Sequence, residues 1–251
     1  MTLTAQAAQR PSDAKEKLII ALDVDSAGAA LSLVEELNGH VGAFKIGLQL
    51  FTAEGPAFVK SLVDAGAKIF LDLKFHDIPN TVAKASVEAA RMGVWMFNIH
   101  ASGGSEMMRT ALHETAEACE REGIVRPRMI GVTVLTSSGE ATLRETGVTA
   151  ETESQVLRLA ALTAECGLDG VVASPREVSA IRSDIEREDF LIVTPGIRPA
   201  FATSDDQKRV MTPAEAIREG ASYIVIGRPV TAASDRVEAV EKIIKEISDG
   251  N

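Results

Sequence analysis

Residues 68–79 read KIFLDLKFHDIP and join a buried strand, charged side chains and the start of a helix. Alternate side chains of a strand share a face. One face here is apolar throughout: Ile69, Leu71, Leu73 and Phe75. We expect that face to pack against helices, while Asp72 and Lys74 point to the opposite side. Pro79 favours the first turn of a helix, so the stretch predicts one strand–helix unit.

Seven other apolar runs rich in Val and Ile resemble this strand. Near-continuous apolar runs are typical of parallel strands that are buried on both faces. The eight runs are Leu18–Val24, Ala43–Leu48, Lys68–Phe75, Val94–Ala101, Met129–Leu135, Gly170–Ser174, Leu191–Ile197 and Tyr223–Arg228. Between them, apolar residues recur at helical spacing, as at Ala30, Leu33, Val34 and Leu37.

Eight strand–helix units without a linker predict an α/β protein with a single (β/α)8 barrel, the TIM-barrel fold. A doubly wound open sheet is the alternative. We expect residues 1–16 to form a flexible N-terminal extension and residues 17–248 to form the barrel, which would be the catalytic domain.

Composition narrows the range of partners. The chain has 251 residues and a formal net charge of −10, which disfavours nucleic acid and anionic membranes as main partners. No apolar run approaches the roughly 20 residues that a membrane-spanning helix needs, and the N-terminus lacks the apolar stretch of a signal peptide. Cys119 and Cys166 form no metal or redox motif, so we expect buried thiols and a cytoplasmic protein.

Charged residues stand where the first three strands end. Asp23 lies in the first apolar run, Lys45 lies in the second, and Asp72 and Lys74 lie in the third, with Asp77 just beyond it. Carboxyl ends of barrel strands form the face that carries the active site in this fold. Burial of charge is costly unless the charges are paired, so we interpret the group as a functional cluster. A salt-bridge network that only closes the barrel is the alternative.

The same end of the barrel carries two histidines, His76 and His100. Two histidines and an aspartate could bind a metal ion. We favour a structural role for both and predict no metal site.

The last two strands end in glycine and arginine. Strand seven continues into TPGIRP at residues 194–199, and strand eight ends in Gly227-Arg228. Loops at these positions often bind phosphate in barrels of this kind, since backbone N–H groups can approach the anion at glycine and arginine can donate two hydrogen bonds. Arg198 lies in the first loop, and Gln207, further along it, could close over a ligand. The pattern predicts a phosphate site.

Together these motifs resemble the orotidine 5′-monophosphate decarboxylases. The resemblance rests on the run from Asp72 to Thr81, DLKFHDIPNT, and covers about residues 17–248. Six shorter motifs follow the family order: Ala21-Leu22-Asp23, Phe44-Lys45-Ile46-Gly47, Leu135-Thr136-Ser137, residues 194–199, Asp206-Gln207 and Ile226-Gly227-Arg228-Pro229.

The resemblance implies that the protein decarboxylates orotidine 5′-monophosphate to UMP, the last step of de novo pyrimidine nucleotide synthesis, without a cofactor. Lys74 would protonate C6 of the pyrimidine, with Asp72 and Lys45 as charged neighbours. Asp77 would come from the other subunit of a homodimer.

The resemblance also assigns substrate contacts. Asp23 and the partner's Thr81 would contact the ribose, with Lys45 nearby, and Thr136 and Ser137 would contact the base. The phosphate would be bound by the remaining residues of the set: Gln207, Gly227 and Arg228, with Arg198 in the same loop.

Two other functions remain open. A metal-dependent sugar-phosphate decarboxylase or epimerase could use the same barrel, although related enzymes bind Mg²⁺ with an acidic residue on strand two, where this chain has Lys45. A non-catalytic module that binds a phosphate ligand would keep Arg228 and Gln207 but would not need Asp72, Lys74 and Asp77 together.

Overall fold

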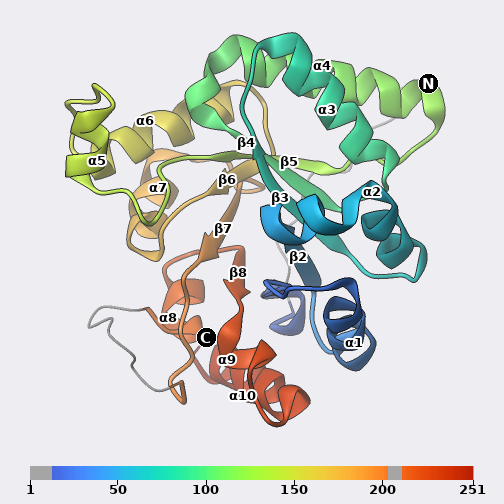
Figure 1. The fold of residues 1–251 in the computed structure, drawn as a ribbon. Coiled ribbons are helices and arrows are strands. Elements are labelled where there is room, and N and C mark those ends of the chain that lie inside the picture. Colours follow the sequence, from blue (N-terminus) through green and yellow to red (C-terminus); the bar gives the residue numbers. More distant parts are fainter. Residues whose placement is uncertain (1–12, 203–210, 251) are drawn as a thin grey trace.

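The computed structural model describes residues 13–202 and 211–250, which form a closed barrel of eight parallel strands (Figure 1). The strands follow one another in chain order, and the first also pairs with the last. They are β1 Leu18–Ala21, β2 Ala43–Gly47, β3 Ile69–Phe75, β4 Met96–His100, β5 Arg128–Val132, β6 Gly170–Val172, β7 Leu191–Pro195 and β8 Tyr223–Ile226. The predicted (β/α)8 barrel is therefore confirmed, and the open sheet is wrong.

Helices surround the barrel (Figure 1). They are α1 Ala27–Leu37, α2 Leu48–Asp64, α3 Pro79–Arg91, α4 Gly104–Glu122, α5 Glu140–Glu145, α6 Thr152–Glu165, α7 Val178–Asp184, α8 Pro213–Arg218, α9 Arg228–Thr231 and α10 Arg236–Asp249, with short 3-10 helices η1 Lys15–Lys17, η2 Ala101–Gly103 and η3 Pro175–Glu177. The local sequence determines where several of these helices begin. Ser26 accepts a hydrogen bond from the Ala29 N–H, and Pro79 opens α3 as predicted.

The strands separate two apolar layers. One fills the barrel and comprises Ile19, Ala21, Ala43, Phe70, Met96, Ile130, Leu191, Val193, Tyr223 and Val225. The other lies between strands and helices and includes Ile69, Leu71 and Leu73. The predicted alternation along β3 is thus confirmed, because Phe70 faces the interior while its neighbours face the helices. Asp72 and Lys74 continue the interior face toward the carboxyl end of β3.

Aromatic and charged side chains cover the opposite, amino-terminal end of the barrel. The Trp95 ring meets the Tyr223 ring edge-on, with 5.1 Å between centroids, and the Arg128 guanidinium lies 4.9 Å from the Trp95 ring centroid. In η1, Glu16 forms an ion pair of 2.9 Å with Lys68. The barrel is therefore filled and covered at this end.

Three details differ from the sequence-based expectations or lie beyond them. β1 ends at Ala21, so Asp23 lies in the following loop and not on the strand as expected. The long segment after β5 contains the short helix α5. Residues 1–12 of the predicted extension lie outside the described residues, as does Gln207. Among the residues described, no helix is long and apolar enough to cross a membrane.

We predict opposite effects for two glycine-to-alanine substitutions. In Gly170→Ala, the new Cβ would collide with the Leu191 carbonyl on β7, so the free energy of unfolding should fall by about 1–3 kcal/mol. Gly28 lies in α1 with open space around it, so Gly28→Ala should be neutral or stabilise by up to about 1 kcal/mol. Urea unfolding followed by circular dichroism measures both. Equal stability of the two variants would contradict the packing at β6.

Candidate active site

A cavity of about 270 Å³ opens at the carboxyl end of the barrel. Its wall has a charged part and an apolar part. The charged part consists of Asp23 in the loop after β1, Lys45 on β2, and Asp72 and Lys74 on β3. The rest of the wall is mostly apolar: Phe70, Val132, Val134, Leu135, Thr136, Val172, Ala173, Val193, Pro195 and Val225. A ligand with one anionic and one apolar or planar part would match this division.

The four charged side chains form one continuous chain of ion pairs. Lys45 Nζ lies 3.0 Å from Asp23 Oδ1 and 3.5 Å from Asp72 Oδ2. Lys74 Nζ lies 2.6 Å from Asp72 Oδ1. Charges therefore alternate in sign from Asp23 to Lys74, which compensates for their removal from water. The predicted clustering of charges is confirmed for these four side chains.

The four charged side chains differ in how deeply they are buried. The side chains of Lys45 and Asp72 are 11% and 14% exposed, whereas Lys74 is 28% exposed and Asp23 is 64% exposed. Asp72 is thus the buried anion between two cations, and the Lys74 ammonium is the more accessible of the two. A ligand in the cavity could reach Lys74 without displacing Lys45.

Asp72 stays ionised in this setting. Burial by itself would raise the pKa of its carboxyl group, but the charges of Lys45 and Lys74 and hydrogen bonds from Lys74 and Asn98 lower it, and the net pKa lies below the ordinary value. The carboxylate is therefore charged at neutral pH and can hold the Lys74 ammonium in place.

The backbone of Lys74 has an unusual conformation. Its φ angle is 53°, and Lys74 is the one non-glycine residue with a positive φ among the described parts of the chain. For a residue with a Cβ this conformation costs on the order of 1–3 kcal/mol and is concentrated at functional sites. The pairing of β3 with β4 is irregular at the same place, between Leu71 and Phe75.

Asn98 on β4 supports this irregular segment and was not among the site residues predicted from the sequence. Its Nδ2 donates to Asp72 Oδ1 at 2.7 Å, and its Oδ1 accepts from the Lys74 backbone N–H at 2.8 Å. Its side chain is fully buried. The available signal was an amide side chain in the middle of the apolar run Val94–Ala101, where a buried polar group needs a partner.

Asp77 and Thr81 do not join the cavity of their own chain. Both side chains are exposed, and Asp77 Oδ1 accepts a hydrogen bond from the Ile78 N–H. Ile78 between them is 65% exposed. The sequence-based grouping of Asp77 with Lys74 is therefore not formed within one chain.

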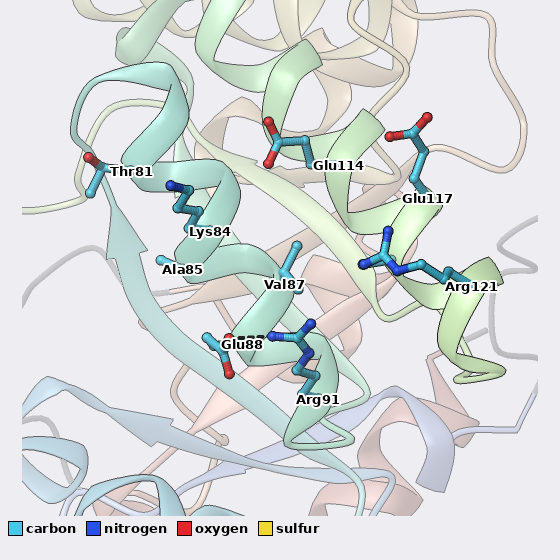
Figure 2. A pocket seen from close by; sticks show the side chains of 10 residues that line it. Thr81, Lys84, Ala85, Val87, Glu88, Arg91, Glu114, Glu117 and Arg121 are labelled. Carbon is cyan, nitrogen blue, oxygen red and sulfur yellow. Dashed lines mark hydrogen bonds and ion pairs between the residues drawn. The ribbon is translucent and has the colours of Figure 1, made fainter.

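A second, more open hollow of about 750 Å³ lies between α3 and α4, with Thr81 near one end (Figure 2). Most of its lining side chains are charged, and Arg91 pairs at 2.6 Å both with Glu88 in the lining and with Glu122 at the end of α4. Although this groove is larger, it lacks the buried array of alternating charges. We therefore assign the chemistry to the cavity at the barrel mouth.

Among the described residues predicted to bind phosphate, Arg198 lies in the loop after β7, and Gly227 and Arg228 directly follow β8. Gly196 has a φ of 79°, which favours glycine, and the Arg198 N–H donates to the Met211 carbonyl. Arg228 is exposed at the start of α9. A Cβ on Gly227 would lie 3.9 Å from Asp23 Oδ2, so this loop borders the charged array. Thr136 lines the cavity, and Ser137, the next residue along the chain, is exposed and is not part of the lining.

His76 and His100 lie together near Lys74, with ring centroids 5.3 Å apart. Burial lowers the pKa of His100, the charges of His76 and Lys74 add to this effect, and Asp72 opposes it. In residues 13–202 and 211–250, no group of three or more His, Cys, Asp or Glu side chains is arranged to bind a metal ion. Cys119 and Cys166 are buried free thiols, as expected.

Comparison with known proteins agrees with this geometry. Residues 16–243 match the sequence profile of the orotidine 5′-phosphate decarboxylase / HUMPS family. A protein of Syntrophotalea carbinolica named orotidine 5′-phosphate decarboxylase is 54% identical over 94% of this chain and 96% of its own length. The enzyme of that name from Geobacter sulfurreducens is also 54% identical, over 94% of this chain and 98% of its own length.

Solved structures give the same result. The crystal structure of orotidine 5′-phosphate decarboxylase from Lactobacillus acidophilus superposes with a TM-score of 0.81 at 40% identity, covering 92% of this chain and 98% of that one. The profile match and the relatives each span nearly the whole barrel. The chain therefore belongs to the orotidine 5′-phosphate decarboxylase / HUMPS family.

Proposed function

We propose that this protein is a carboxy-lyase that converts orotidine 5′-monophosphate to UMP and CO₂, as the last step of pyrimidine nucleotide synthesis in the cytoplasm. The observation that carries the proposal is the alternating array of Asp23, Lys45, Asp72 and Lys74 on one side of a largely apolar cavity. The family and the names of its relatives agree with this activity.

The array suits a reaction that makes a carbanion. When the C6–carboxylate bond breaks, the electron pair stays in the plane of the pyrimidine ring, where the π system cannot delocalise it. A fixed ammonium beside C6 can stabilise this charge and then donate its proton to C6. Lys74 is the more exposed of the two ammonium groups that line the cavity, and solvent can reprotonate it after UMP leaves.

Asp72 has two effects in this mechanism. Its hydrogen bond to Lys74 Nζ directs the ammonium, and its own negative charge lies close to where the substrate carboxylate would be. The substrate loses its negative carboxylate as neutral CO₂, which removes the repulsion and is compatible with the apolar wall. Lys45 holds Asp72 from the other side.

Binding would come from residues around the mouth. Arg228, the Gly227 backbone and Gln207 would bind the phosphate, with Arg198 nearby, while Thr136 and Ser137 would contact the base. Asp23 would bind the ribose beside Lys45. Contacts to the distant phosphate supply binding energy that can order the site around the reacting atoms.

We further propose a homodimer that completes the site. Asp77 and Thr81 are exposed and lie away from their own cavity, on either side of the exposed Ile78. A second copy that covered this surface would bury Ile78 and bring Asp77 to the Lys74 of its partner and Thr81 to the ribose.

A metal-dependent sugar-phosphate decarboxylase or epimerase is not favoured. Lys45 Nζ lies between the carboxylates of Asp23 and Asp72. A divalent cation at that place would be repelled by the ammonium. The proposed reaction needs neither a metal ion nor an organic cofactor, so turnover of orotidylate should be unaffected by EDTA. If EDTA abolished the activity and Mg²⁺ restored it, the result would support a metal-dependent decarboxylase or epimerase instead.

Replacement of Lys74 is the direct test of the chemistry. Lys74→Ala should lower kcat for orotidylate by at least about 1,000-fold, since it removes both the proton donor and the stabilising charge. Lys60→Ala, which removes an exposed lysine paired with Asp64 on α2, should leave kcat unchanged. Loss of absorbance as orotidylate becomes UMP measures both. If the parent binds nucleotide without converting it and Lys74→Ala binds equally well, the protein is a binding module.

Arg228→Ala should act on binding. Loss of charge-assisted hydrogen bonds to phosphate should raise KM for orotidylate roughly 10- to 100-fold, with little change in thermal stability because Arg228 is exposed. Arg144→Ala, which removes an exposed arginine paired with Glu140 on α5, is the matched control. An unchanged KM would place the phosphate elsewhere.

Mixing two inactive variants tests the shared site. Lys74→Ala and Asp77→Ala homodimers should each be strongly impaired. If Asp77 acts in the partner's site, each mixed dimer contains one site with both residues intact. Subunit exchange between equal amounts should therefore restore roughly a quarter of the parent activity. No recovery, in a mixture shown by native mass spectrometry to contain mixed dimers, would contradict the arrangement.

A further inference from the structure

One buried side chain, that of Asn98, forms hydrogen bonds with both Asp72 and Lys74 but is not part of the cavity lining. Asn98 is fully buried and shares the interior face of β4 with Met96. A primary amide in such surroundings is costly unless both of its polar ends are paired. Both hydrogen bonds of Asn98 go to the proposed catalytic segment: one to the Asp72 carboxylate and one from the Lys74 backbone.

The strand pairing explains why an amide is needed there. Leu71 pairs with Phe97, and Phe75 pairs with Ile99, so three residues of β3 lie opposite Asn98 alone. This bulge leaves the Lys74 N–H without a regular ladder partner, and the Asn98 Oδ1 accepts its hydrogen bond instead. The bulge contains the left-handed Lys74.

The other end of the amide fixes the carboxylate. Asp72 Oδ1 accepts from Asn98 Nδ2 at 2.7 Å and from Lys74 Nζ at 2.6 Å, while Oδ2 faces Lys45 at 3.5 Å. A donor at Nδ2 and an acceptor at Oδ1 are both required, so neither leucine nor ionised aspartate can replace asparagine.

We propose that Asn98 is a positioning residue for the decarboxylation: it holds the Lys74 backbone in its left-handed conformation and sets the rotation of the Asp72 carboxylate, and so aims the Lys74 ammonium at the substrate. The inference rests on the proposed function. It gives Asn98 a role in turnover with no contact to the substrate.

Two substitutions separate positioning from general stability. Asn98→Leu removes both hydrogen bonds and should lower kcat roughly 100-fold, the effect of a misplaced reacting group, while KM changes less than about threefold. Asn98→Asp retains the acceptor. When protonated, its carboxyl group can also donate to Asp72, as the amide does, so this variant should recover activity as the pH falls from about 8 toward 5, unlike Asn98→Leu. At higher pH the ionised pair should repel and kcat should drop.

Thr115→Val provides the matched control. Thr115 is fully buried on α4, and its hydroxyl has no hydrogen-bond partner within the described residues. This variant should leave kcat and the pH profile as in the parent. If Asn98→Leu keeps its kcat, or if Asn98→Asp follows the parent's pH profile, Asn98 does not position Lys74.

Crystal structures of the variants provide a readout that does not need turnover. In Asn98→Leu, the φ angle of Lys74 should leave the left-handed region or its ammonium should turn away from Asp72. A parent that leaves orotidylate unchanged would refute the proposed function alone. An unchanged Lys74 and Asp72 in the Asn98→Leu structure would overturn the positioning role alone.

Discussion

The Asp72 carboxylate, held between two ammonium groups at the mouth of the barrel, is the constraint on which the rest of the site depends. It lies in a place where a lone charge would be unfavourable, and it stays ionised because Lys45 and Lys74 surround it. The attraction works in both directions, since each lysine is also held by the carboxylate. Removal of the Asp72 carboxylate would leave Lys74 without this partner and Lys45 paired only with the exposed Asp23, which is more costly than the loss of one surface ion pair.

The barrel supplies this arrangement through the geometry of its strands. β1, β2 and β3 are adjacent and parallel, so side chains that follow from their carboxyl ends lie close together at the mouth of the barrel. Below the charges, apolar side chains fill the interior and keep water from the inner side of Lys45 and Asp72. The polar array therefore stands on a rigid apolar base, which limits the motion of groups that must meet a substrate within tenths of an ångström.

Much of this could be predicted from the sequence. Apolar runs and helical spacing gave the eight strands and most helices, and strict alternation along β3 separated Leu71 and Leu73 from Asp72 and Lys74. These signals are local, because the period of a strand is two. The bulge opposite Asn98 and the left-handed Lys74 could not be found in this way, since they depend on how two strands pair. Likewise, the exposed positions of Asp77 and Thr81 follow from where β3 ends and α3 begins in space. The roles of these residues, and of Gln207, stay predictions.

The covered amino-terminal end of the barrel has a kinetic consequence. Trp95, Tyr223 and Arg128 lie across that end, and apolar side chains fill the barrel between them and the cavity, so among the described residues the cavity opens toward the carboxyl end of the barrel. Substrate and product must then use the same opening, and the product must dissociate before a new substrate molecule can bind. Occupancy by product is then directly competitive with substrate, and the rate of emptying sets an upper limit on turnover however fast the bond is broken.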